Sequence, residues 1–151
     1  MVRTALSPVE LLAGVADPEL PFLSIVDLGI LREVEVDGSM VRVTITPTYS
    51  GCPAMDAIRS DIKAMLAANG FDSEIVTNLS PPWTTDDLSP QAHALLALHG
   101  FAPPGPENQV TCPRCSETPA RMLSRFGSTA CKALMVCNSC GEPFDLFKEL
   151  R

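Results

Sequence analysis

Two Cys-x-x-Cys pairs near the carboxyl end limit the possible folds of this chain more than any other feature. Cys112 and Cys115 form the first pair, and Cys137 and Cys140 form the second. Four thiolates with this spacing can converge on one tetrahedral metal ion, which requires the segment between the pairs to fold back on itself. Because protein sulfurs fill all four positions, such a site favours a structural or electron-transfer role over hydrolysis.

The spacing does not by itself identify the metal. Four thiolates suit a structural Zn²⁺ ion, and they also suit a single iron in an electron carrier such as rubredoxin. We predict structural Zn²⁺, with a rubredoxin-like electron carrier as the alternative. The two differ in colour, since an iron–tetrathiolate protein is red and a zinc ribbon is colourless.

Length and composition indicate one ordinary domain with a small appendage. The chain has 151 residues, of which 46% are hydrophobic and 19% are charged, so a hydrophobic core can form and disorder is disfavoured. No apolar run of about 18 residues occurs, so no membrane span is expected. The first residues also lack a signal-peptide pattern. The sequence therefore predicts a cytoplasmic protein whose cysteines are metal ligands or reactive thiols.

Charge is distributed unevenly along the chain. Residues 1–105 contain five basic and thirteen acidic side chains, whereas residues 106–151 contain six and five. The acidic larger part repels phosphate backbones, which disfavours nucleic-acid binding and a DNA-binding zinc-ribbon module. Arg121, Arg125 and Lys132 lie in a stretch without acids. This stretch either forms a solvated strand face or faces an acidic partner.

Local signals predict a small α+β domain over residues 1–105, in the order helix, strand, strand, helix, strand, helix. Ser7 and Glu10 form a capping box for the first helix, which Asp17-Pro18 should end. Alternating apolar residues between 31 and 46 predict a hairpin with its turn at Asp37-Gly38.

The helical period returns after Cys52-Pro53, and Asn69-Gly70 should end this second helix. A strand follows over residues 71–79, and a third helix runs from Ser89-Pro90 to Gly100. If the second and third strands pair in parallel, the helix between them is a crossover, and the result is a three-stranded mixed sheet.

Residues 106–151 are predicted to form a zinc ribbon, after a linker that begins at Phe101. Its strands should cover residues 121–125, 131–136 and 144–148. The segment is too short to build its own core, so the metal ion must supply most of its folding free energy.

Cys52 is the second candidate for chemistry. It precedes a helix whose N-terminal amides and dipole would lower the pKa of the thiol, which suits a nucleophile, a redox thiol or a soft-metal ligand. The alternative is a small buried residue. A Cys–His enzyme is disfavoured, because His93 and His99 are six positions apart on a helix and point to different faces. His99 falls on the apolar stripe of that helix, which predicts a partly buried structural histidine. The chain is not expected to be catalytic on its own.

Other candidates have ordinary structural explanations. Cys131 is expected to be an apolar strand residue, with an alternative ligand or a second reactive thiol as the other interpretations. Asp17, Glu19 and Asp27 could bind a hard cation but also fit helix caps and turns. Trp83, after two prolines, is expected to be an exposed loop aromatic, either an interaction anchor or a side chain packed over the sheet edge.

Several segments of the first domain resemble iron–sulfur assembly factors of the eukaryotic cytosolic pathway and their bacterial relatives. These segments are residues 17–19 (DPE), 26–29 (VDLG), 46–55 (TPTYSGCPAM) and 81–84 (PPWT). With the two cysteine pairs and residues 126–134 (FGSTACKAL), nearly the whole chain resembles the PaaD (PaaJ) family. That family comprises accessory subunits of the bacterial phenylacetyl-CoA epoxidase, a multicomponent oxygenase.

The resemblance implies a maturation role in aerobic phenylacetate catabolism. Cys52 occupies the position of the family's reactive cysteine, so transient handling of iron or an iron–sulfur cluster is expected there. Other epoxidase subunits or iron–sulfur assembly proteins are the implied partners, and the identity of the recipient and homodimerisation stay open. One departure is Ser116, which stands where a glycine often follows the first cysteine pair. This predicts a slightly strained metal site that still forms.

Overall fold

The protein is described by a computed structural model covering residues 6–48, 54–105, 109–117, 120–127 and 131–148. The chain divides into two compact units, Met1–Trp83 and Thr84–Arg151. The predicted sequence domains, 1–105 and 106–151, stay a prediction. In the described part of the chain, no helix is long and apolar enough to cross a membrane.

The first helix, α1 (Pro8–Leu12), begins at the predicted capping box. The Ser7 N–H donates to Glu10 Oε2 over 2.7 Å, and the Glu10 N–H donates to Ser7 Oγ over 3.3 Å. The predicted end at Asp17-Pro18 is wrong, because the chain leaves the helix after Leu12. Ala16 instead forms an antiparallel bridge with Ser24, so pairing with the following loop replaces further helical turns.

A three-stranded sheet forms the centre of this unit, in the order β1-β2-β3. β1 (Leu31–Asp37) pairs antiparallel with β2 (Met40–Ile45), and β3 (Asp72–Thr77) pairs parallel with β2. Asp37 and Met40 are opposite one another, so the two turn residues lie one position later than predicted. Gly38 has a φ of +60°, a left-handed conformation that favours glycine in such a turn.

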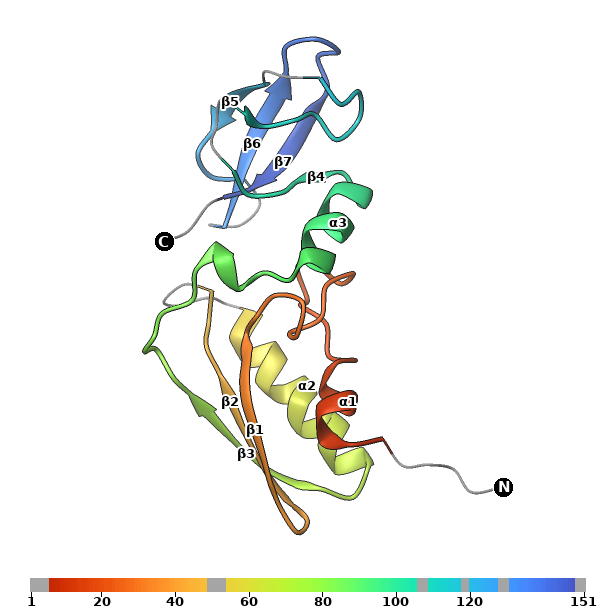
Figure 1. The fold of residues 1–151 in the computed structure, drawn as a ribbon, viewed down its shortest axis with the longest axis vertical. Helices are drawn as coiled ribbons and strands as arrows, with labels where there is room; N and C mark the ends of the chain where they lie inside the picture. Colours follow the sequence, from red (N-terminus) through yellow and green to blue (C-terminus); the bar gives the residue numbers. More distant parts are fainter. Residues whose placement is uncertain (1–5, 49–53, 106–108, 118–119, 128–130, 149–151) are drawn as a thin grey trace, which may run out of the picture. The chain divides into compact units, whose positions relative to one another are not determined.

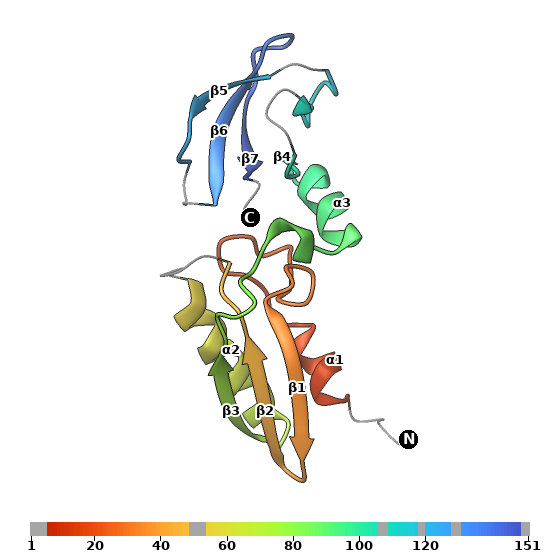
Figure 2. The same cartoon turned by 60° about the vertical axis from the view of Figure 1, so that its left-hand side comes forward.

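The helix between the parallel strands, α2 (Ala54–Ala68), covers one face of this sheet (Figures 1 and 2). Its buried positions recur at helical spacing: Ala54, Met55, Ile58, Ile62 and Leu66. Val41, Val43 and Ile45 of β2 are also fully buried, which is the alternation expected of a half-covered sheet. The predicted mixed sheet with a crossover helix is therefore confirmed.

The second unit begins with a short 3-10 turn, η1 (Thr85–Asp87), and α3 (Pro90–Leu98). Its four-stranded sheet has the order β4-β7-β6-β5. The strands are β4 (Phe101–Ala102), β5 (Ala120–Ser124), β6 (Lys132–Cys137) and β7 (Pro143–Phe147). The three predicted ribbon strands are confirmed to within one residue at each end. β4 was missed, because a two-residue strand has no alternating pattern.

Candidate metal centre

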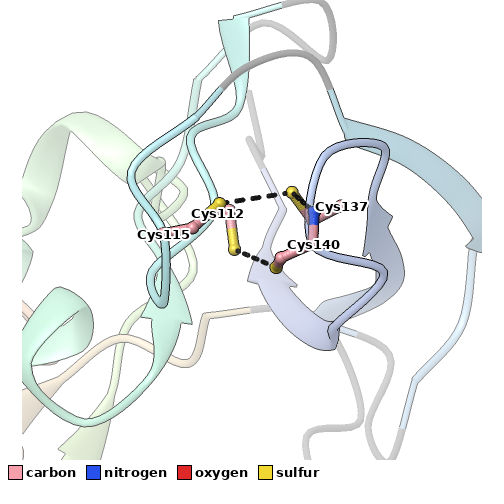
Figure 3. Close-up of side chains that lie close together, drawn as sticks. All are labelled: Cys112, Cys115, Cys137 and Cys140. Carbon is pink, nitrogen blue, oxygen red and sulfur yellow. Dashed lines mark hydrogen bonds between the residues drawn. The ribbon is translucent and has the colours of Figure 1, made fainter.

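The four paired cysteines come together at one end of the ribbon. Their sulfurs lie within 4.8 Å of one another, with 3.8 Å between Cys112 and Cys140 and 3.5 Å between Cys115 and Cys137 (Figure 3). A tetrahedral ion with metal–sulfur bonds of about 2.3 Å places its ligands about 3.8 Å apart. The donor set and its spacing therefore fit one four-coordinate Zn²⁺ or iron ion, and they leave no position open for a substrate.

Both cysteine pairs sit on loops with the same backbone hydrogen bonds. The Ser116 N–H donates to the Cys112 carbonyl over 2.9 Å, and the Gly141 N–H donates to the Cys137 carbonyl over 3.0 Å. The N–H groups of Cys112 and Cys137 then donate to the carbonyls of Glu117 and Glu142, each over 3.0 Å. Each loop therefore turns its two sulfurs to the same side without help from the other loop.

One backbone position differs between the two loops. Ser116 has a φ of +65° and Gly141 has a φ of +75°, so both are left-handed. The left-handed conformation costs a residue with a side chain about 1–2 kcal/mol, whereas glycine adopts it freely. The expected strain at Ser116 is therefore present in the backbone, and the loop closes despite it.

Backbone amides also stabilise thiolate charge at the centre. The N–H groups of Ser139 and Cys140 donate to Cys137 Sγ over 3.3 and 3.4 Å. The Cys140 N–H, with help from that of Ser139, outweighs burial and lowers the pKa of Cys137 to about 6. For Cys115, an N–H from Glu117 favours the thiolate, but burial and the neighbouring thiols outweigh it and raise the pKa to about 12.

An ion pair connects the two loops at the surface. Arg114 Nη1 lies 2.9 Å from Glu142 Oε2, with side chains that are 69% and 41% exposed. Exposed ion pairs contribute only about 0–1 kcal/mol to the free energy of folding. The main effect of this one is therefore to favour one orientation of the two loops relative to each other. The Arg114–Glu142 pair was not predicted from the sequence. The signal for it was the opposite charge of two residues at the two cysteine loops.

The other predicted site residues are not part of this centre. Cys52 and Pro53 lie outside the described residues, and the role of Cys52 stays a prediction. Cys131 is buried, as expected of an apolar residue, but it lies directly before β6 and not within the strand, and it is not among the four clustered cysteines.

The acidic residues of the first loop hold the backbone in place. Asp17 is buried, and its Oδ1 accepts N–H groups from Glu19 over 2.7 Å and Leu20 over 3.1 Å. Asp27 and Ser24 exchange two hydrogen bonds between backbone and side chain. Among the described residues, only the four paired cysteines form a group able to hold a metal ion.

Two aromatic positions differ from expectation. Trp83 is buried, and its Nε1–H donates to the Leu28 carbonyl over 2.7 Å, so it anchors the 26–29 loop within the first unit. His99 is exposed, whereas a partly buried histidine was expected. The reason is that α3 ends at Leu98, which leaves His99 as its C-cap instead of a member of the apolar face.

The chain is similar to two protein families, one for each half. Residues 2–76 match the model described as "Iron-sulfur cluster assembly protein", and residues 99–148 match the model described as "PaaD zinc beta ribbon domain". The four clustered cysteines all fall within the second match.

Individual relatives agree with these matches. A "Putative 1,2-phenylacetyl-CoA epoxidase" subunit of Escherichia coli (strain K12) is 44% identical over 91% of this chain and 88% of its own length. The "Fe-S protein maturation auxiliary factor YitW" of Bacillus subtilis (strain 168) is 36% identical over 58% of this chain and 87% of its own length. A crystal structure of a DUF59 domain from Bacillus anthracis is 33% identical, with a TM-score of 0.56 over 60% of this chain and 89% of that one.

Proposed function

Because this chain belongs to the PaaD family of 1,2-phenylacetyl-CoA epoxidase subunits, we propose that it is an accessory protein that helps to assemble the iron or iron–sulfur centres of that epoxidase system. One observation carries the proposal: an iron–sulfur assembly domain and a ribbon with a closed four-cysteine centre occur in one chain. A closed centre has no coordination position for oxygen or substrate, which favours an accessory role over the epoxidation itself.

In this proposal the two halves of the chain have different roles, and the first half handles the cargo. Iron or a cluster is the cargo, and Cys52 is the residue that handles it. Cys52 precedes α2 by two positions, and the N-terminus of a helix favours a thiolate through its free amides and its dipole. The motif around Cys52, residues 46–55, is also part of the half that matches the assembly family.

The ribbon provides structure and docking in this proposal. When bound, the metal ion holds four thiolates in their charged form and cross-links the two cysteine loops. The chain contributes the remaining order: the backbone bonds of each loop, the Arg114–Glu142 pair and the short strands behind them. Other epoxidase subunits or iron–sulfur assembly proteins are the proposed partners, and a homodimer is compatible with this role.

The decisive test is Cys52→Ala in cells that depend on this protein for growth on phenylacetate. We expect poor growth and a purified epoxidase system that is deficient in iron or cluster. Cys131→Ala is the matched control, since it removes a cysteine that lies outside the four-cysteine cluster. A fully loaded and active epoxidase from the Cys52→Ala strain would show that Cys52 does not transfer the cargo.

A rubredoxin-like electron carrier is the second candidate, because the sulfur geometry and the N–H···S bonds at Cys137 suit iron as well as zinc. Metal analysis of the purified protein separates the two. Stoichiometric zinc without visible absorption supports the accessory role. Stoichiometric iron at the four cysteines, with a red colour that fades on reduction, supports the electron carrier.

A further inference from the structure

The outer edge of the ribbon carries a surface that the metal centre does not use. We define the basic–apolar edge as five side chains on or next to β5: Arg121, Leu123, Arg125, Phe126 and Lys148. Leu123 is 51% exposed and Phe126 is 68% exposed, although both are large and apolar. Among the described strands, β5 is the last of its sheet, and its outer side pairs with none of the others (Figure 1).

A β-bulge brings Leu123 to the surface. Met122 pairs with Met135, and Ser124 pairs with Leu134. Leu123 is therefore an extra residue without a register partner on β6. Such a bulge twists an edge strand and makes it a poor template for a further strand. A partner would therefore recognise the side chains at this edge and not extend the sheet.

The aromatic side chain next to the bulge is held in place. Ser124 Oγ donates to the Phe126 carbonyl over 2.9 Å and accepts the Phe126 N–H over 3.2 Å. Lys148 Nζ lies 4.4 Å from the centroid of the Phe126 ring and donates to the Arg125 carbonyl over 2.8 Å. An exposed aromatic group that is already ordered loses little conformational entropy when a partner covers it.

The stretch that carries these two apolar side chains is basic, although the Asp145 carboxylate of β7 lies next to Gly127. Residues 118–141 contain no acidic side chain, in a chain with a net charge of −7. Arg121 and Arg125 are exposed, and the half-buried Lys148 adds a third cation. Lys132, which the sequence placed in the same basic stretch, is buried against the Phe101 ring and is not part of this surface.

We propose that the basic–apolar edge docks an acidic protein surface, in which a hydrophobic pocket receives Phe126 and Leu123 and surrounding carboxylates pair with the three cations. An aromatic anchor with a charged rim is the usual arrangement of a binding hot spot. The inference rests on the proposed function in one respect: the acidic partner is an epoxidase subunit that receives the cargo. The rest of the chain is acidic and repels such a partner, so the charge pattern orients it toward this edge.

The test uses the full-length, metal-loaded protein and each purified subunit of the epoxidase from the same organism, titrated by calorimetry at low and high salt. We expect one subunit to bind, more weakly at high salt. Phe126→Ser should lower its affinity by at least about tenfold, as should the double variant Arg121→Glu/Arg125→Glu. Leu98→Ser and Lys63→Glu are the matched controls, since they alter an exposed leucine and an exposed lysine elsewhere and should leave the affinity unchanged.

Metal content and circular dichroism of each variant establish that it is folded. Unchanged binding by folded Phe126→Ser overturns the proposal, and so does the lack of any complex with the wild-type chain. Self-association that Phe126→Ser abolishes would identify a second copy of this chain as the occupant, which also overturns the assignment to an acidic epoxidase subunit. The iron content of the epoxidase from Cys52→Ala cells tests the maturation role separately, so the two proposals can fail independently.

Discussion

The two units of this protein obtain their stability in different ways. Of the twelve largest fully buried side chains among the described residues, nine belong to the first unit and three to the second. The core of the ribbon sheet combines four larger buried residues, Val110, Met135, Phe144 and Leu146, with five small ones: Ala102, Ala120, Ala133, Cys112 and Cys137. We therefore expect the first unit to be stabilised mainly by its hydrophobic core, and the ribbon to depend more on an ion bound by cysteines that include two members of its own core.

Removal of the metal should show the difference in stability between the two units most clearly. We expect a strong chelator, or Cys137→Ser, to unfold the ribbon and leave the β1–β2–β3 sheet intact. Structural zinc contributes about 10–16 kcal/mol of apparent binding free energy in zinc-finger peptides, more than a ribbon of this size can replace. Residue-resolved hydrogen exchange measures the effect: amides of β6 and β7 lose protection, and amides of α2 keep it.

Cys131→Ala is the control, since it alters a buried ribbon cysteine that is not in the metal cluster. If chelation removes protection from α2 as well, the first unit depends on the ribbon and the contrast between the units is wrong.

Ile62→Ala tests whether the ribbon depends on the stability of the first unit. Ile62 is fully buried on the sheet-facing side of α2, and such a truncation costs about 2–5 kcal/mol through lost burial and a residual cavity. Urea unfolding of the first unit should shift accordingly, while the metal content stays at its wild-type value. Loss of metal from folded Ile62→Ala would show that the ribbon requires the first unit.

Trp83→Phe should have a smaller effect within the first unit. The substitution keeps an aromatic ring but removes the Nε1–H that donates to the buried Leu28 carbonyl. An unsatisfied buried carbonyl costs about 1–3 kcal/mol, so the free energy of unfolding should fall by that amount and amides of the 26–29 loop should exchange faster. Equal stability of Trp83→Phe and wild type would mean that water replaces the lost donor.

The smallest effect is expected at the two left-handed positions of the metal centre. Ser116→Gly removes left-handed strain and should stabilise the metal-bound ribbon by about 1 kcal/mol, and Gly141→Ser should destabilise it by a similar amount. Competition with a chelator of known affinity measures both changes. Equal metal affinity in the two variants would contradict the strain assigned to Ser116.

Much of the fold is visible in the sequence because it depends on local patterns. The capping box at Ser7, the apolar spacing of α2 and the alternation of β2 each reflect contacts within a few residues. The two cysteine pairs likewise contain their own turns, so the convergence of four sulfurs follows from the spacing.

The features that the sequence did not predict depend on contacts with residues outside the local pattern. α1 ends early because Ala16 pairs with Ser24, and Trp83 is buried because a carbonyl 55 positions away accepts its N–H. β4 exists only through its pairing with β7, which lies more than 40 residues later. The Arg114–Glu142 pair requires both cysteine loops to be in place. Periodicity contains no information about such contacts.

The matching backbone of the two cysteine loops has a consequence for the order of folding events. The Cys137 loop lies within the contiguous β6–β7 hairpin and has glycine at its left-handed position. The Cys112 loop has neither advantage, because it is not the turn of a hairpin among the described strands and has Ser116 at its left-handed position. We therefore expect the ion to be captured first by Cys137 and Cys140, and the Cys112 loop to close over it afterwards. Stopped-flow metal uptake checks this sequence of steps, since Cys112→Ser should retain the fast phase and Cys140→Ser should lose it.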